Sequence, residues 1–154
     1  MKFKYYMNGK ELQEVSDEKD LGVLFTNDLK ASKQCLAAYK KANRVLGMIR
    51  RTITYKSREV ILSLYKSLVR PHLEYCTPAW SPHYQKDKLL LERVQHRMTR
   101  MCPALKDLEY EKRLEKLGLW TLEERRNRAD VLEVFKMYSG RSALPFSDMF
   151  EVSA

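Results

Sequence analysis

Residues 31–52 read ASKQCLAAYKKANRVLGMIRRT, and this stretch predicts one long amphipathic helix. Its apolar residues recur at helical spacing and would form a single face. They are Cys35, Ala38, Ala42, Val45, Leu46 and Ile49. Four cations fall within a stripe of roughly 40° on the opposite side of the helical wheel. They are Lys33, Lys40, Arg44 and Arg51. The helix is therefore expected to turn one side toward a core and a narrow basic side away from it.

Two further helices are expected downstream. Ser57 is a suitable N-cap for a second helix, which Pro71 should kink or end near Arg70. An irregular connection, punctuated by proline and aromatic residues, follows to residue 84. The third helix is expected over 87–102. Its outer side would carry three arginines close together, namely Arg93, Arg97 and Arg100.

The last part of the chain predicts a short helix and a longer one. The short helix, over 110–117, should end at Gly118, a usual helix C-terminal residue. Thr121 and Glu124 have the spacing of a capping box and would open the final helix. Its expected core face consists of Val131, Leu132, Phe135 and Tyr138.

The N-terminus predicts β-structure instead. Asn8-Gly9 is a strong signal for a two-residue hairpin turn between strands over 3–7 and 10–15. Residues 16–20 are expected to form a polar turn, and the apolar run 21–25 a third strand. The fold class is thus mainly α, with a short β-hairpin or ribbon followed by about five helices. We expect a ribbon over 1–29, a helical region over 30–140 and a flexible tail over 141–154.

The distribution of charge is the most informative feature for function. The chain of 154 residues has a net charge of +9, but residues 1–29 carry −2 and residues 71–154 only +1. Residues 30–70 hold eleven Lys and Arg side chains and one acid, Glu59. A solvated helical face normally mixes both signs, so a block of one sign in an ordered segment favours a polyanionic partner.

The sequence offers no comparable sign of catalysis, metal binding or membrane insertion. There is no Asp-Asp pair, glycine-rich phosphate loop or nucleophile motif, and no run of about 18 apolar residues. Cys35, Cys76 and Cys102 form no CxxC pair, so we expect buried, reduced thiols of an intracellular protein. His72 and Cys76 could share a helix face, but a metal site needs three or four ligands. No cofactor is expected.

Nucleic acid is therefore the expected partner, held by its backbone without reading of base sequence. The candidate contact residues are Lys30, Lys33, Lys40, Lys41, Arg44, Arg50, Arg51, Lys66 and Arg70. The alternative is that these cations only form a solvated face. Arg125 and Arg126 lie in a charge-balanced segment, where charge reversal should change binding little.

Several short runs resemble the end of LINE-type, jockey-like non-LTR retrotransposon reverse transcriptases. They are Lys19-Asp20-Leu21-Gly22-Val23, Ser32-Lys33-Gln34-Cys35, Lys41-Ala42-Asn43-Arg44-Val45-Leu46-Gly47, Leu64-Tyr65-Lys66-Ser67-Leu68-Val69-Arg70-Pro71-His72-Leu73-Glu74-Tyr75-Cys76, Trp80-Ser81-Pro82, Leu91-Glu92-Arg93-Val94-Gln95 and Tyr110-Glu111-Lys112-Arg113-Leu114. The similarity runs in order from about residue 5 to residue 138.

This resemblance implies a place in a larger RNA-directed DNA polymerase. Leu21, Gly22 and Val23 would belong to the primer-grip ribbon at the edge of the palm, and the helices from Ala31 onward to the thumb and the region beyond it. The family's aromatic-x-Asp-Asp motif and its endonuclease are absent from this sequence, so the chain is expected to be a non-catalytic fragment. Its partner would be RNA, DNA or an RNA–DNA hybrid duplex, in the nucleus or cytoplasm.

Two other interpretations stay open at this stage. The helices could form a protein-interaction module whose basic face meets an acidic protein surface, or the chain could be a translated element remnant without function. If the ribbon is built to lie against a palm, Tyr5, Leu21, Val23 and Phe25 should leave apolar surface or a strand edge exposed. Weak self-association or a mobile N-terminus would follow.

Overall fold

The computed structural model describes residues 3–151. In chain order its elements are β1 (Tyr6–Met7), β2 (Lys10–Glu11), β3 (Asp17–Asp20), β4 (Val23–Thr26), α1 (Ser32–Thr52), α2 (Arg58–Leu64), the π-helical η1 (Tyr65–Val69), α3 (Arg70–Glu74), the 3-10 turn η2 (Thr77–Ala79), α4 (Gln85–Thr99), the 3-10 turn η3 (Pro103–Leu105), α5 (Tyr110–Leu117), α6 (Leu122–Tyr138) and the 3-10 turn η4 (Phe146–Asp148). Because α2, η1 and α3 follow without interruption, the described chain has five α-helical segments after two short hairpins. This confirms the mainly α fold class.

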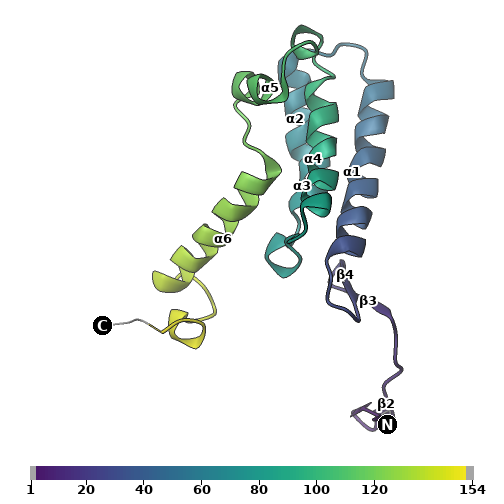
Figure 1. The fold of residues 1–154 in the computed structure, drawn as a ribbon, viewed down its shortest axis with the longest axis vertical. Helices are drawn as coiled ribbons and strands as arrows, with labels where there is room; N and C mark the ends of the chain where they lie inside the picture. Colours follow the sequence, from purple (N-terminus) through teal and green to yellow (C-terminus); the bar gives the residue numbers. More distant parts are fainter. Residues whose placement is uncertain (1–2, 152–154) are drawn as a thin grey trace.

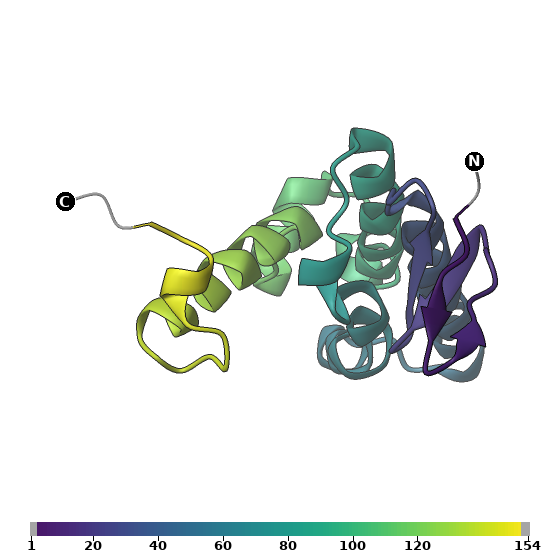
Figure 2. The same ribbon diagram turned by 90° about the horizontal axis from the view of Figure 1, so that it is seen from below.

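Three helical segments form the body of the molecule. α1, the continuous α2–η1–α3 segment and α4 lie side by side, with α5 near one end (Figure 1). The β3–β4 hairpin lies at the N-terminal end of α1, and the β1–β2 hairpin lies farther out beyond it (Figure 1). Viewed from below, α6 with η4 extends away from the body on the side opposite the hairpins (Figure 2). Figures 1 and 2 agree that the C-terminal part of α6 stands apart from the other helices.

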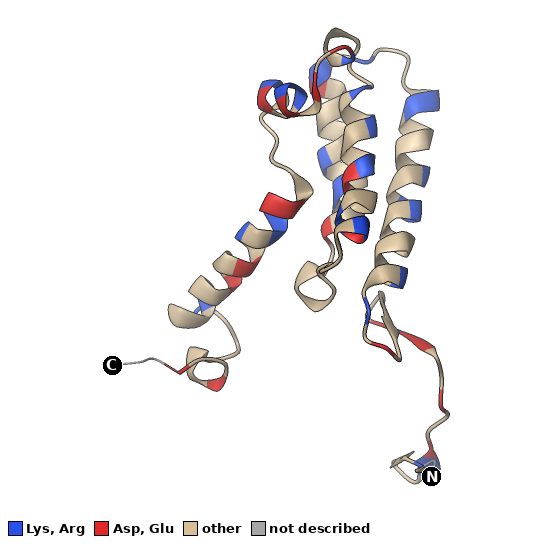
Figure 3. Ribbon diagram, in the orientation of Figure 1, with Lys and Arg blue, Asp and Glu red and all other residues tan. Residues whose placement is uncertain are grey.

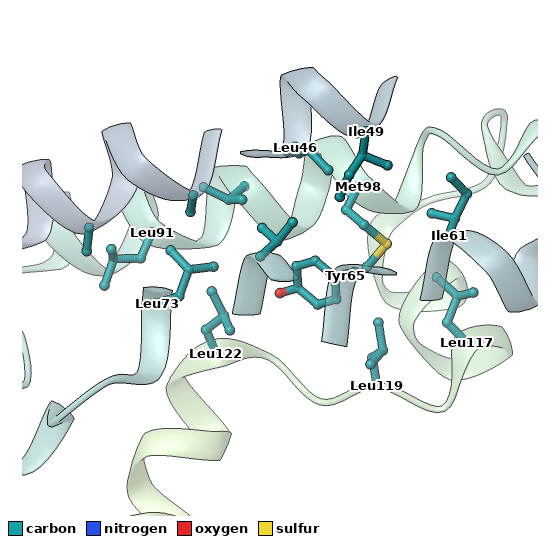
Figure 4. Packing of buried hydrophobic residues seen from close by; sticks show 14 of the residues in the cluster. Leu46, Ile49, Ile61, Tyr65, Leu73, Leu91, Met98, Leu117, Leu119 and Leu122 are labelled. Atoms are coloured by element: carbon teal, nitrogen blue, oxygen red, sulfur yellow. The ribbon is translucent and has the colours of Figure 1, made fainter. Parts of the chain in front are cut away.

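The core lies between these helices and the chain that joins α5 to α6. Figure 4 shows Leu46 and Ile49 of α1 facing Met98 of α4, with Tyr65 of η1 beside them. Leu119 and Leu122 close this core from the α5–α6 side. Full burial of such a side chain contributes roughly 1.5–3 kcal/mol, so the packing of these apolar faces dominates the stability of the bundle.

A buried polar network joins α4 to η1, α5 and α6. Gln95 of α4 is fully buried; its Oε1 accepts a hydrogen bond from Tyr65 Oη (2.7 Å) and its Nε2 donates to the Trp120 carbonyl (2.9 Å). Glu92, one turn earlier, accepts from Tyr110 Oη and, at 2.9 Å, from the backbone amide of Leu122. The network therefore anchors the chain between α5 and α6 to the bundle.

The prediction for the N-terminal strands is partly wrong. The Asn8-Gly9 turn is confirmed, with both residues at positive φ, but the strands that it joins are only two residues long. The expected turn over 16–20 is instead strand β3, which pairs antiparallel with β4. Leu21 and Gly22, expected in a strand, form the turn between them with φ of 45° and 88°. Two successive residues with positive φ match the twist of hairpin strands. Gly22 adopts a positive φ without strain because it has no Cβ.

Pro71 does not end the second helix. The chain remains helical to Glu74, with a π-helical segment, η1, directly before the proline. A proline ring clashes with the carbonyl four residues earlier, here that of Ser67, which belongs to η1. The wider π turn provides a physical reason why the helix continues.

The expected core face of α6 is wrong. Val131 and Tyr138 are 68% and 71% exposed, and Leu132 and Phe135 are exposed as well. Leu122 and Arg126 are the residues of α6 that are buried. The periodicity correctly predicted an apolar face, but the last three turns of the helix run beyond the bundle. Within the described residues this face meets η4, where Phe146 packs edge-to-face on Tyr138, and it stays largely exposed.

The two hairpins should differ in hydrogen exchange. β1 and β2 are wholly exposed, whereas in β4 Val23 and Thr26 are buried and the Leu24 amide donates to Gln34 Oε1 of α1 at 3.0 Å. Exposed two-residue strands open at little cost in free energy, so the amides of 6–11 should exchange with almost no protection and those of 23–26 much more slowly. Exchange followed by NMR measures this, and equal strong protection of both hairpins would contradict it.

Weak self-association through the exposed ribbon stays a prediction.

Candidate nucleic-acid interface

The outward side of α1 carries unpaired positive charge. Lys40, Arg44 and Arg51 are exposed on the side of the helix opposite the buried Ala42 and Ile49. None of the three forms an ion pair within residues 3–151. Figure 3 shows basic and uncharged positions along α1 and no acidic one. We call Lys40, Arg44 and Arg51 the basic stripe.

Two of the predicted contact residues are neutralised at the start of α1. Lys33 Nζ lies 2.6 and 2.9 Å from the two carboxylate oxygens of Asp17 in β3. Lys30 Nζ lies 3.0 Å from Asp28, whose pKa is lowered by hydrogen bonds from Thr26 and Lys30. Lys30 and Lys33 thus carry less free charge than the other predicted contact residues, because Asp17 of β3 and Asp28 after β4 lie beside them. Their contact with nucleic acid stays a prediction.

A basic groove adjoins the basic stripe between α1 and α4. Its volume is about 530 Å³. Its walls carry the cations Arg50, Lys56, Arg97 and Arg100, and no acid from the described residues lines it. Gly47 lies on the α1 side, and Arg97 Nη1 donates to Asn43 Oδ1 at 3.1 Å. The groove extends the acid-free surface of α1 onto a second helix.

The groove residues from α4 were absent from the predicted contact set. The sequence placed Arg97 and Arg100 on the outer side of a helix, but assigned them no partner surface. The apolar faces of α1 and α4 were the available signal, since packing these faces together brings the flanks of the two helices side by side.

The other predicted cations lie elsewhere. Lys41 lines a separate cavity of about 470 Å³ with His72, whose pKa is lowered by burial and by the charge of Lys41. Lys66 and Arg70 line a third pocket with residues of the α5–α6 region, and Arg70 Nε lies 3.5 Å from Glu74. The structure thus distributes the predicted set over four places: the ion-paired start of α1, the stripe with its groove, the Lys41 cavity and the pocket of Lys66 and Arg70.

The residues compared with a primer grip have clear structural roles. Val23 is buried, and Leu21 is exposed at the tip of the turn. The Leu21 carbonyl accepts a hydrogen bond of 2.9 Å from Tyr75 Oη, and a Cβ on Gly22 would lie 3.5 Å from the Tyr75 ring. The turn is therefore held against the chain that follows α3. A role in holding a primer stays a prediction.

The thiols and carboxylates form no metal-ligand cluster. Within the described part of the chain, no three His, Cys, Asp or Glu residues are placed to hold a metal ion. Cys35 and Cys102 are buried as expected, and burial raises the pKa of Cys35 to about 12. Cys76 is exposed, so the expectation that this thiol is buried is wrong. It adopts a left-handed conformation after α3 has ended, so the idea that it shares a helix face with His72 is wrong too. Asp87 is buried at the start of α4, where it accepts a 2.6 Å hydrogen bond from Ser32 Oγ.

The two arginines chosen for their charge-balanced surroundings are structural. Arg125 forms a two-point ion pair with Glu74 of α3. Arg126 is buried, its two Nη atoms lack hydrogen-bond partners among the described residues, and burial lowers its pKa. Reversing either charge would disturb the fold, so Arg125 and Arg126 are unsuitable as a control for binding, and the effect of their reversal on binding stays a prediction.

Over residues 3–151 no helix is both long enough and apolar enough to cross a membrane. No family model, curated protein or solved structure matches the chain.

Proposed function

We propose that this chain binds the backbone of nucleic acids through the basic stripe on α1 and the adjoining groove against α4. One observation carries the proposal: stripe and groove together present seven Lys and Arg side chains, and no acidic residue lines the groove or lies on α1. The phosphate groups of a nucleic-acid backbone are anions at regular spacing, so they suit cations that follow one another along α1. Charge-assisted contacts from Lys and Arg to phosphate are about twice as strong as neutral hydrogen bonds.

Binding of this kind should be independent of base sequence. Lysine and arginine contacts to phosphate position a protein on nucleic acid without carrying sequence information. It should also depend steeply on salt, because each neutralised phosphate releases condensed counterions. Fluorescence anisotropy on an RNA–DNA hybrid and on unrelated DNA duplexes, at several salt concentrations, tests both properties.

The resemblance to the end of LINE-type reverse transcriptases supports the same proposal. The thumb of such a polymerase holds its template–primer duplex by the backbone, and α1 is the first helix of the region that resembles a thumb. We infer an intracellular, non-catalytic C-terminal piece of an RNA-directed DNA polymerase, acting on RNA, DNA or their hybrid duplex.

The purified chain is expected not to extend a primed template. Two-metal polymerisation needs carboxylates that hold both ions. The sequence contains no Asp-Asp pair, and the resemblance places the paired aspartates upstream. The assay is primer extension with Mg²⁺ or Mn²⁺ on an RNA template. Template-dependent extension by the clean protein would overturn the non-catalytic assignment.

A protein-interaction module is the second candidate, and one observation favours it. Along the outer part of α6, Val131, Val134, Phe135 and Tyr138 are all exposed, and exposed apolar helix faces often mark protein contacts. This candidate predicts weak nucleic-acid binding with little dependence on salt. A chain that binds neither nucleic acid nor protein would instead fit a translated remnant.

A further inference from the structure

A second basic pocket lies on a part of the bundle away from the stripe and the groove. It has a volume of about 480 Å³, within the usual range of roughly 300–1,000 Å³ for ligand pockets. Its walls come from η1 and α3 on one side and from residues 118–128 on the other. Lys66, Arg70, Arg125, Arg128 and Trp120 line it, and no acid from the described residues does. We call it the Trp120 pocket.

The charges around this pocket fall into two pairs with different roles. Glu74 binds Arg70 at 3.5 Å and Arg125 through both carboxylate oxygens, which ties α3 to α6 and holds the two walls together. Lys66 and Arg128 form no ion pair within residues 3–151. Arg70 and Arg125 therefore stabilise the walls of the pocket through Glu74. Lys66 and Arg128 give the pocket its positive charge.

Trp120 is held in place but left in contact with water. Its carbonyl accepts a 2.9 Å hydrogen bond from the fully buried Gln95, which anchors the backbone. Yet 46% of the residue is exposed, and the Arg128 guanidinium carbon lies 4.6 Å from the ring centroid. By contrast Trp80, the chain's other tryptophan, is 5% exposed and serves the core. The packing of the bundle does not account for the position of the Trp120 indole.

The floor of the pocket has open space at Gly118, two residues before Trp120 in the chain. Gly118 ends α5 with φ of +61°, and a Cβ built there would have no heavy atom within 4 Å. The space at Gly118 can therefore take part of a ligand without displacing protein atoms, and the exposed 46% of Trp120 is available to a planar group. A rigid aromatic ring, a stacked guanidinium and free ammonium charge are the features with which proteins hold unpaired nucleotides.

We propose that the Trp120 pocket binds an unpaired nucleotide of single-stranded nucleic acid. The base stacks on the indole beside Arg128, and its phosphate meets Lys66. A single strand is favoured over a duplex because stacking on protein needs a free base face, which duplex bases share with their neighbours. This site uses none of the stripe or groove residues, so it does not depend on duplex binding through α1.

The test is binding of a fluorescently labelled hexathymidylate, followed by anisotropy, with an abasic hexamer of equal length as the second probe. Base stacking contributes roughly 1–3 kcal/mol, so Trp120→Ala should weaken hexathymidylate binding by about ten-fold or more. Lys66→Ala should lower the log–log salt slope by roughly 0.7, the value for one phosphate on a single strand. Hexathymidylate should also quench the indole fluorescence of the unmodified chain.

Tyr84→Ala is the matched control, because Tyr84 is equally exposed, at 47%, and has Lys86 over its ring at 5.6 Å. It should bind hexathymidylate like the parent. The proposal is overturned if the abasic hexamer binds as tightly as hexathymidylate, or if Trp120→Ala and Lys66→Ala both leave binding unchanged. Duplex binding through the stripe is tested separately. It would be refuted if a Lys40→Glu/Arg44→Glu variant kept the parental affinity for duplexes.

Discussion

Replacing Glu92 by leucine is expected to lower the free energy of unfolding by about 3 kcal/mol, although leucine is the more apolar residue. The carboxylate accepts hydrogen bonds from Tyr110 Oη and from the Leu122 amide, and both donors would be left buried without it. Each buried donor without a partner costs roughly 1–3 kcal/mol. The effect is large because these two bonds hold α5 and the start of α6 on α4. Urea denaturation followed by circular dichroism measures it.

Glu115→Leu on the exposed side of α5 is the control, and surface changes of this kind usually stay within about 0.5 kcal/mol. Burial raises the pKa of Glu92, while the hydrogen bonds act in the opposite direction. The native state thus holds this proton more tightly than the unfolded chain, so stability from this group is present at low pH. This contribution to the free energy of unfolding is lost as pH rises through the native pKa of Glu92. The leucine variant should lack this pH-dependent part of the stability. Equal losses in the Glu92 and Glu115 variants would refute a structural role for the network.

The sequence predicted the helices well because their signals are local. The Thr121–Glu124 capping box and the left-handed Gly118 involve residues within one turn of each other, and both are confirmed. Strand β3 shows the opposite case. Residues 17–20 are all charged, which favours a turn on local grounds. They form a strand because Leu21-Gly22 makes the turn and pairs them with β4.

The function-related errors have one physical origin, since pairing over long sequence separations cannot be deduced from local pattern. Lys33 is neutralised by Asp17, 16 residues away, and Arg125 by Glu74, 51 residues away. The sequence had placed Lys33 among the contact residues and Arg125 in a charge-balanced segment, and it showed neither pairing. The basic block over 30–70, with Glu59 as its single acid, predicted the basic surface of α1, but it could not show that Arg97 would lie across a groove from Arg50.

The apolar face of α6 was misplaced for a related reason. Helical periodicity shows which residues share a face, but only the tertiary structure shows whether another element covers it. On α6 the periodic face carries Phe135, which is exposed, whereas Arg126 is buried together with Leu122. Its guanidinium has no hydrogen-bond partner within the described residues, a costly arrangement that composition would not predict.

Charge reversal at Lys40 and Arg44 should abolish most duplex binding. Both side chains are exposed near the middle of α1, and glutamate is a good helix former, so the fold should persist. At about 1 kcal/mol for each lost attraction, the Lys40→Glu/Arg44→Glu variant should bind roughly thirty-fold more weakly, before any added repulsion. The log–log salt slope on duplex DNA should fall by roughly 1.8, for two phosphate contacts. Anisotropy on several duplexes measures both effects, which should be alike on unrelated sequences.

The control needs two exposed cations with the same spacing on a charge-balanced helix. Lys112 and Lys116 of α5 meet this requirement, because Glu111 and Glu115 alternate with them and both lysines are exposed. Lys112→Glu/Lys116→Glu changes the net charge by the same amount, so a general effect of charge would weaken both variants equally. A specific interface on α1 requires the loss to be confined to the Lys40/Arg44 pair. If that pair keeps the parental affinity and salt slope, the stripe is a solvated face and the exposed apolar side of α6 becomes the better candidate for a binding surface.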